Sequence, residues 1–189
     1  ANTICSGTTG TVSFTGTPNA VVTYTVDGGA NQTVTLDASG NASVTTPVLT
    51  VNSTYALVSV TTTATPICSQ AQTASATVTV TALPTASISG STTICSGSTA
   101  VISFTGTANA VVTYTVDSGA NQTITLDATG NASVTTPALT ANSTYALVSV
   151  TATTTPACTN TASGSAVVTV LPLPTAAISG ATTICSGAT

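Results

Sequence analysis

The stretch TTICSG at residues 92–97 decides how this chain is organised, because it returns at fixed intervals. It recurs at residues 182–187, and a shorter form, TICSG, occupies residues 3–7. Their cysteines, Cys5, Cys95 and Cys185, are 90 residues apart, and so are the two other cysteines, Cys68 and Cys158. The chain is therefore a tandem array of one repeated unit.

This period divides the 189 residues into two units and the start of a third. We expect domains at 1–83 and 84–173, with 174–189 as the first strand of a third repeat. The first unit is expected to lack the lead-in strand that the second unit has, and no signal peptide is visible, so we interpret the chain as starting within a repeat. Prolines between the units predict short, semi-rigid linkers and an extended rod in which each unit contacts its neighbours.

Each unit has the pattern of an all-β domain. Short runs rich in Thr and Val alternate with Gly, Asn and Asp turns, and no run has the apolar spacing of a helix. About seven strands per unit predict a β-sandwich of the immunoglobulin-like or fibronectin-III-like type. In the second unit we expect strands at 85–89 continued by 92–95, 101–105, 110–116, 123–126, 132–136, 144–151 and 166–171.

A leucine followed six residues later by a tyrosine that opens a strand occurs in both units, as Leu49 with Tyr55 and Leu139 with Tyr145. This spacing resembles the tyrosine corner of such sandwiches, in which the tyrosine hydroxyl bonds back to the backbone. The alternative is an ordinary half-buried tyrosine.

The charge inventory excludes several classes of function. The chain has no Lys, Arg or His and only four Asp, for a net charge of −4. Binding to nucleic acid or to anionic lipid needs basic side chains, and the apolar runs are too short to span a membrane. Ser and Thr nucleophiles have no His or Lys to activate them, so we expect no enzyme activity and no cofactor.

The four carboxylates do not predict a metal site. Asp27, Asp37, Asp117 and Asp127 all lie in expected turns rich in Gly and Asn. A calcium site needs several converging carboxylates. We therefore interpret these residues as turn formers.

Several motifs together resemble one family. They are the CSG after a Thr-Ile strand, TYALVSV at 54–60 and 144–150, the PIC or PAC loops that end at Cys68 and Cys158, and VTV before proline. The whole repeat resembles the Ig-like or PKD-like tandem repeats of very large Bacteroidota surface proteins, such as gliding-motility adhesins and other cargo of type IX secretion. The resemblance implies disulfides within each unit, Cys5–Cys68 and Cys95–Cys158, with Cys185 bonded to a partner outside these residues.

The 90-residue period alone leaves the pairing open. Cys68–Cys95 and Cys158–Cys185 have the same regularity and would join neighbouring units instead. Regular cysteine pairs in small β-rich units favour an oxidising compartment, although buried free thiols are the alternative.

The functional hypothesis is a structural repeat of a long extracellular or cell-surface protein, serving as a stalk or fibre that adheres or self-associates. Its expected partners are neighbouring repeats, other copies of itself, or surface glycans. A carbohydrate- or surface-binding adhesin module is the alternative, although the few aromatic residues look committed to the core. A remoter alternative is ice binding by Thr-x-Thr pairs such as Thr23 with Thr25. The ordinary explanation of these pairs is that threonine is a common outward-facing residue of strands.

Overall fold

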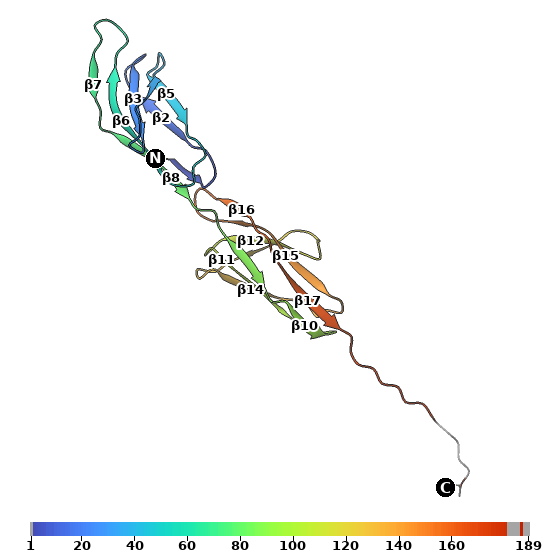
Figure 1. The fold of residues 1–189 in the computed structure, drawn as a ribbon. Helices are drawn as coiled ribbons and strands as arrows, with labels where there is room; N and C mark the ends of the chain where they lie inside the picture. The colour runs from blue at the N-terminus through green and yellow to red at the C-terminus, as the bar shows by residue number, and fades with distance from the viewer. Residues whose placement is uncertain (1, 181–185, 187–189) are drawn as a thin grey trace.

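The computed structural model describes residues 2–180 and residue 186, and all its regular elements are β-strands. They form two units placed end to end, followed by a segment that extends away from the second unit (Figure 1). Each unit has its own buried cluster of apolar side chains. The chain is thus all-β, with two immunoglobulin-like sandwiches in tandem.

The second unit has a sheet of three strands and a sheet of six. The smaller sheet has the order β14-β11-β9, from β9 (Ala86–Ser89), β11 (Val101–Gly106) and β14 (Asn131–Thr135). The larger has the order β10-β17-β15-β12-β13, from β10 (Thr92–Cys95), β12 (Val111–Val116), β13 (Gln122–Thr125), β15 (Ser143–Thr151) and β17 (Ser165–Leu171), and β16 (Thr159–Thr161) also pairs with β15.

The first unit repeats this plan with one strand fewer. Its larger sheet has the order β1-β8-β6-β3-β4, from β1 (Asn2–Cys5), β3 (Val21–Val26), β4 (Gln32–Thr35), β6 (Ser53–Thr61) and β8 (Ser75–Thr81), with β7 (Ser69–Ala71) paired to β6. Its smaller sheet holds β2 (Thr11–Thr15) and β5 (Asn41–Thr45). Among the described residues, nothing takes the place that β9 has in the second unit.

The expected strands of the second unit are present, with one difference. The first strand is interrupted as predicted, and its two parts join different sheets, since β9 pairs with β11 and β10 runs parallel to β17. The expected last strand is β17, whereas the short strand β16 before it was not predicted, and Gly164 between the two has φ +138°. The domain boundaries at 83/84 and 173/174 stay predictions.

Alternation along the strands builds each core. On β12, Val112 and Tyr114 are buried, whereas Thr113 and Thr115, which alternate with them, are partly exposed. The rings of Phe104 and Tyr114 lie 4.9 Å apart, within the range for favourable aromatic contacts. The apolar side chains therefore point inward, and threonines form much of the outer face.

The turn before β14 depends on Gly130. It has φ +81°, and a Cβ there would lie 2.3 Å from the carbonyl oxygen of Gly106. Gly97 has a similar φ of +87°, but nothing lies within 4 Å of its position. The two glycines share the same backbone conformation and differ in the space around them.

We expect Gly97→Ala to lower the free energy of unfolding by about 1 kcal/mol, the cost of a positive φ. Gly130→Ala should cost at least about 1 kcal/mol more, because the added methyl also displaces backbone. Urea denaturation of both variants measures the difference. Equal costs would show that the Gly130–Gly106 contact does not constrain the turn.

Candidate functional site

The candidate functional site is the junction between the two sandwiches, which a disulfide crosses. On the first sandwich, Cys5 ends β1, which runs parallel to β8 with Cys5 opposite Thr81. The Ser6 amide donates to the Thr81 carbonyl at 2.8 Å. Cys5 is therefore fixed beside the point where the chain leaves the first sandwich.

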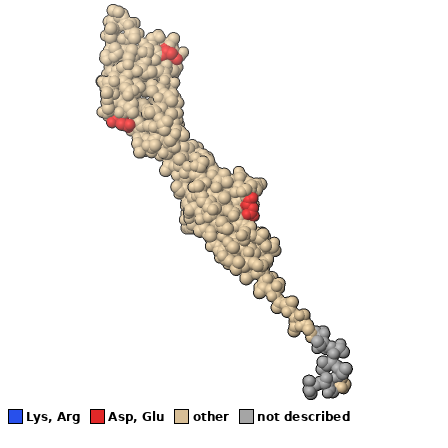
Figure 2. All heavy atoms as spheres, turned by 45° about the vertical axis from the view of Figure 1, so that its right-hand side comes forward, with Lys and Arg blue, Asp and Glu red and all other residues tan. Residues whose placement is uncertain are grey.

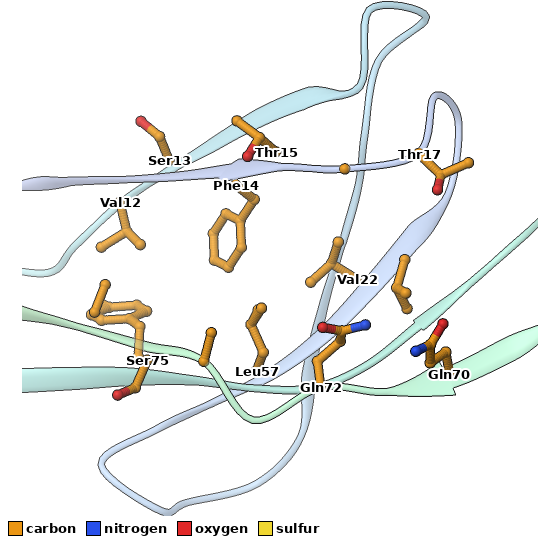
Figure 3. Close-up of a pocket in the computed structure, with 15 residues that line it drawn as sticks. Val12, Ser13, Phe14, Thr15, Thr17, Val22, Leu57, Gln70, Gln72 and Ser75 are labelled. Atoms are coloured by element: carbon orange, nitrogen blue, oxygen red, sulfur yellow. The ribbon is translucent and has the colours of Figure 1, made fainter.

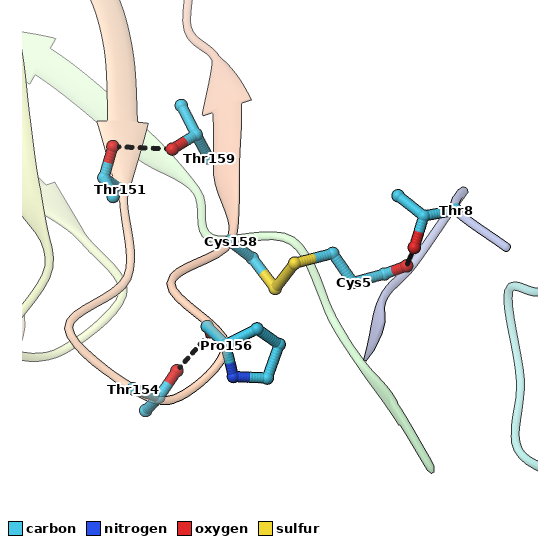
Figure 4. Close-up of a disulfide and its surroundings, with 7 residues drawn as sticks. All are labelled: Cys5, Thr8, Thr151, Thr154, Pro156, Cys158 and Thr159. Carbon is cyan, nitrogen blue, oxygen red and sulfur yellow. Dashed lines mark hydrogen bonds between the residues drawn. A yellow bond between two sulfur atoms is a disulfide. The ribbon is translucent and has the colours of Figure 1, made fainter. Parts of the chain in front are cut away.

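On the second sandwich, Cys158 lies in the loop between β15 and β16. The Ala152 amide donates to the Cys158 carbonyl at 2.8 Å, which closes this loop. Cys158 is fully buried and forms a disulfide with Cys5, with Sγ atoms 2.05 Å apart and Cα atoms 5.6 Å apart (Figure 4). The bond joins the two units directly.

Residues 82–85 between the units are also held in place. Pro84 is fully buried, and the Asn160 side-chain amide donates to its carbonyl at 3.0 Å. Thr85 and Thr107 form two hydrogen bonds, from the Thr107 amide to the Thr85 carbonyl and from the Thr85 amide to Thr107 Oγ1. The linker is thus bonded to the second sandwich as well as bridged by the disulfide.

The disulfides Cys5–Cys68 and Cys95–Cys158, implied by the family resemblance, are wrong. Cys5 lies beside the end of β8, which pairs with the start of β6, whereas the Cys68 carbonyl accepts from the Thr62 amide beyond the end of β6. The nine residues of β6 span about 30 Å. A disulfide tolerates Cα atoms about 4–7 Å apart, so two cysteines at opposite ends of one sandwich cannot pair.

The alternative pairing Cys68–Cys95 is also wrong, because both residues are exposed free thiols in the described part of the chain. Cys158–Cys185 is excluded because Cys158 is bonded to Cys5. Cys185 itself lies outside the described residues. The observed pair joins the first cysteine of one unit to the second cysteine of the next, an offset that sequence reasoning missed. Placing each cysteine at one end of its sandwich would have found it.

Both tyrosines of the expected corner are buried, Tyr55 at 4% and Tyr145 at 3% exposed, with Leu49 and Leu139 packed against the same cores. Burial raises the pKa of the Tyr55 hydroxyl, with a further rise from Tyr24. A hydrogen bond with the Ser53 side chain opposes that rise. The bond from each hydroxyl to the backbone stays a prediction.

The aspartates act in turns. Asp27 accepts from Ser53 Oγ at 2.9 Å and from the Thr54 amide at 2.7 Å, and Asp117 does the same with Ser143 and Thr144. Asp37 and Asp127 each accept backbone amides of their own turns. Among the described residues, no three carboxylate or cysteine side chains gather as metal ligands would. Asp37 and Asp127 thus bond within their own turns, whereas Asp27 and Asp117 connect their turns to the start of β6 and of β15.

Comparisons with known proteins add little. No protein-family model and no curated protein matches this sequence. The solved human OSCAR ligand-binding domain matches 88% of this chain and 92% of its own, at 14% identity and a TM-score of 0.40. Trypsin-activated alpha-2-macroglobulin from Escherichia coli matches at 13% identity and a TM-score of 0.32, over 89% of this chain but only 16% of its own. In addition, no helix among the described residues has the length and apolarity to cross a membrane.

The pKa of Asp127 is lowered, chiefly by the hydrogen bond from Thr129 Oγ1 at 2.6 Å and then by backbone amides. A lowered pKa means that these bonds stabilise the turn above the ordinary Asp pKa of about 4, and that this stabilisation is lost as the pH falls through the lowered value. We expect Thr129→Ala to raise the Asp127 pKa, measured by NMR titration of the carboxyl carbon. No change would show that the threonine hydroxyl does not contribute.

Peptide mapping without reduction should show the bond across the junction. A protease that cleaves before Asp divides the chain into 1–26, 27–36, 37–116, 117–126 and 127–189. In the Cys185→Ser variant, we expect 1–26 linked to 127–189, because Cys5 and Cys158 lie in those peptides. A link from 1–26 to 37–116 would instead restore pairing within the first unit.

Proposed function

We propose that this chain is a structural, load-bearing repeat of a long extracellular surface or filament protein. One observation carries the proposal: the Cys5–Cys158 disulfide crosses from one sandwich to the next. A bond within each sandwich would stabilise separate domains on a flexible chain. A bond across the junction stiffens the array itself.

The position of the disulfide in the chain determines which residues carry a pulling force. The bonded cysteines are 153 residues apart, so both sandwiches lie largely inside the closed loop. A force applied to the two ends passes from Cys5 through the sulfur atoms to Cys158. The residues between them are then bypassed and cannot be extended while the bond is intact.

The same bond also stabilises the folded state. On the chain-entropy model, closing a loop of 153 residues stabilises the fold by about 5 kcal/mol. That is a large part of the stability of a small domain. A chain bridged in this way resists both mechanical and thermal unfolding.

The disulfide and the composition of the chain support an extracellular location. Disulfides persist mainly in oxidising compartments, and the absence of Lys and Arg leaves no site for trypsin-like proteases. Figure 2 shows a surface with only a few small acidic patches. Together with the motifs that resemble Bacteroidota repeats, these features support a surface stalk of that class.

The alternative role in carbohydrate binding is less well supported. Sugar platforms in proteins commonly use exposed aromatic rings, but Phe14, Tyr24 and Tyr55 are only 7%, 3% and 4% exposed. Their counterparts in the second unit, Phe104, Tyr114 and Tyr145, are also buried. The aromatic side chains thus serve the cores.

Single-molecule extension tests the load-bearing role. With the chain tethered by its two ends, we expect the bypassed residues to stay locked until a reductant is added. Reduction should then release about 500 Å of extra contour length, because 153 residues extend at about 3.4 Å each.

Two variants serve as controls. Cys158→Ser should release the full length without reductant, whereas Cys68→Ser should behave as the parent chain because Cys68 is free. If the parent chain extends fully without a reductant, the disulfide does not carry the load and the proposal fails.

A further inference from the structure

We propose that the outer face of the small sheet in the second sandwich binds neutral carbohydrate, in a polar hollow between β11 and β14. The hollow has a volume of about 290 Å³ and is lined by residues of both strands and by Asp127 of the turn before β14. This size is at the lower end of the range for small-molecule pockets, about 300–1,000 Å³. The inference goes beyond the load-bearing role and does not depend on it.

Alternation along the two strands places polar side chains on this face. On β11, Phe104 is fully buried, whereas Ser103 and Thr105 on either side of it are half-buried and exposed. On β14, Asn131 and Ser133 are exposed. The antiparallel register puts Ser103 opposite Ser133 and Thr105 opposite Asn131. Four polar side chains from two strands therefore share one surface.

The turn before β14 adds a carboxylate to this surface. Asp127 Oδ1 accepts three hydrogen bonds, from the Thr129 amide at 2.8 Å, from Thr129 Oγ1 at 2.6 Å and from the Asn131 amide at 3.0 Å. None of these bonds uses Oδ2, the second carboxylate oxygen. Because Asp127 lines the hollow, Oδ2 is a charged acceptor for a bound molecule, and charged acceptors form the stronger hydrogen bonds.

The side-chain amide of Asn131 is held in one orientation. Its Nδ2 donates to the Thr129 carbonyl at 3.3 Å and to Thr129 Oγ1 at 2.9 Å. The nitrogen thus faces the turn, and Oδ1 is left to accept from another molecule. The hydroxyls of Ser103 and Ser133 can each donate and accept by rotation. The hollow therefore combines two fixed acceptors with two adaptable hydroxyls.

This set of groups suits a molecule with several adjacent hydroxyls. The ring hydroxyls of a sugar donate to carboxylate and amide oxygens and accept from serine hydroxyls. Asp127 is the single charged residue in the lining, and the chain has no Lys, Arg or His, so an anionic sugar would be repelled. A calcium ion takes about six to eight oxygen ligands, commonly with several carboxylates. A neutral sugar is therefore the ligand that these groups fit.

The first sandwich has the same groups. All seven lining residues recur with the same identity 90 positions earlier. Asp37 again uses Oδ1 to accept two amides of its own turn, and Asn41 Nδ2 again donates to a carbonyl of that turn. Ser13 and Thr15 point outward, away from the core side chain Phe14 (Figure 3). The arrangement is thus built twice in this chain.

Binding at one such site should be weak. The aromatic rings are buried in the two cores, so a sugar cannot stack on them and binding depends on hydrogen bonds formed in competition with water. The net gain from each such bond is small. Two sites on one chain that engage the same polysaccharide raise the overall affinity. A stalk of such units would therefore hold neutral polysaccharide better than any single unit does.

NMR titration of the whole ¹⁵N-labelled chain tests the site. The probes are neutral hexamers of glucose, mannose and xylose, with a hexamer of galacturonic acid as the anionic comparison. We expect at least one neutral hexamer to shift the backbone amides of Ser103, Asn131 and Ser133 at millimolar concentrations. The galacturonic acid hexamer should not shift them.

Two variants probe the groups that carry the binding. Asp127→Asn should weaken binding at the second sandwich about tenfold, because a hydrogen bond to a charged group contributes more than one to a neutral group. The asparagine keeps an oxygen for the amides of the turn, and the signals of the first sandwich serve as an internal control. Ser133→Val removes one hydroxyl, narrows the hollow and suits a strand, and should weaken binding by a similar factor.

Thr135→Val is the matched control. Thr135 is exposed on the same strand and the same face, but it does not line the hollow. This change should leave the affinity for the hexamer unchanged. The melting temperature of each variant, followed by circular dichroism, shows whether its fold is retained.

Each of three results would overturn the inference. The first is that no neutral hexamer shifts these amides, and the second is that binding is insensitive to both Asp127→Asn and Ser133→Val. The third is that Ca²⁺ shifts the same amides and no sugar does. None of them bears on the load-bearing role of the Cys5–Cys158 bond, because single-molecule extension measures that role without a sugar.

Discussion

The covalent bond between Cys5 and Cys158 is the constraint on which the arrangement of the two sandwiches depends. It connects the exit end of one unit to a loop at the entry end of the next, while Asn160 and Thr107 hold the linker against the second unit. Three independent contacts thus fix one short connection. Bending at this linker would break several of these bonds at once.

Within each sandwich, the polar side chains are satisfied by hydrogen bonds alone, without the ion pairs that most proteins also have. Without Lys, Arg or His, no carboxylate can pair with a basic side chain. The aspartates instead accept backbone amides in turns, and buried threonines are satisfied locally. Thr46, 3% exposed, accepts from the Gly10 amide at 2.8 Å and donates to the Pro47 carbonyl at 2.7 Å. Thr136 has the same role in the second unit.

The two units show how far a repeat depends on its neighbour. Their sequences are nearly the same, but their cores differ in exposure because only the second has a lead-in strand in place. Its strand β9 directly follows the linker, so the segment that connects the units also completes a sandwich. The elements that join two units and those that complete each one are therefore the same residues.

The sequence by itself determined the local structure and the excluded chemistry. Alternating Val and Thr, Gly and Asp at turns, and the 90-residue period predicted the strands, the sandwich class and the tandem order, since these depend on residues close in the chain. It also placed the aspartates in turns and the aromatic rings in the cores. The short strand β16 was not predicted, because its three residues are too few to show an alternating pattern.

Only the tertiary structure shows which cysteines form the disulfide. The period is identical for pairing within a unit, between neighbouring units, or with the observed offset, so spacing cannot distinguish them. The choice depends on which end of a sandwich each sulfur occupies, which follows from the parallel pairing of β1 with β8 and the length of β6. A cavity of about 440 Å³ in the first sandwich likewise appears only when the two sheets are assembled, because its lining side chains come from β2, β6 and β8, which are far apart in the chain.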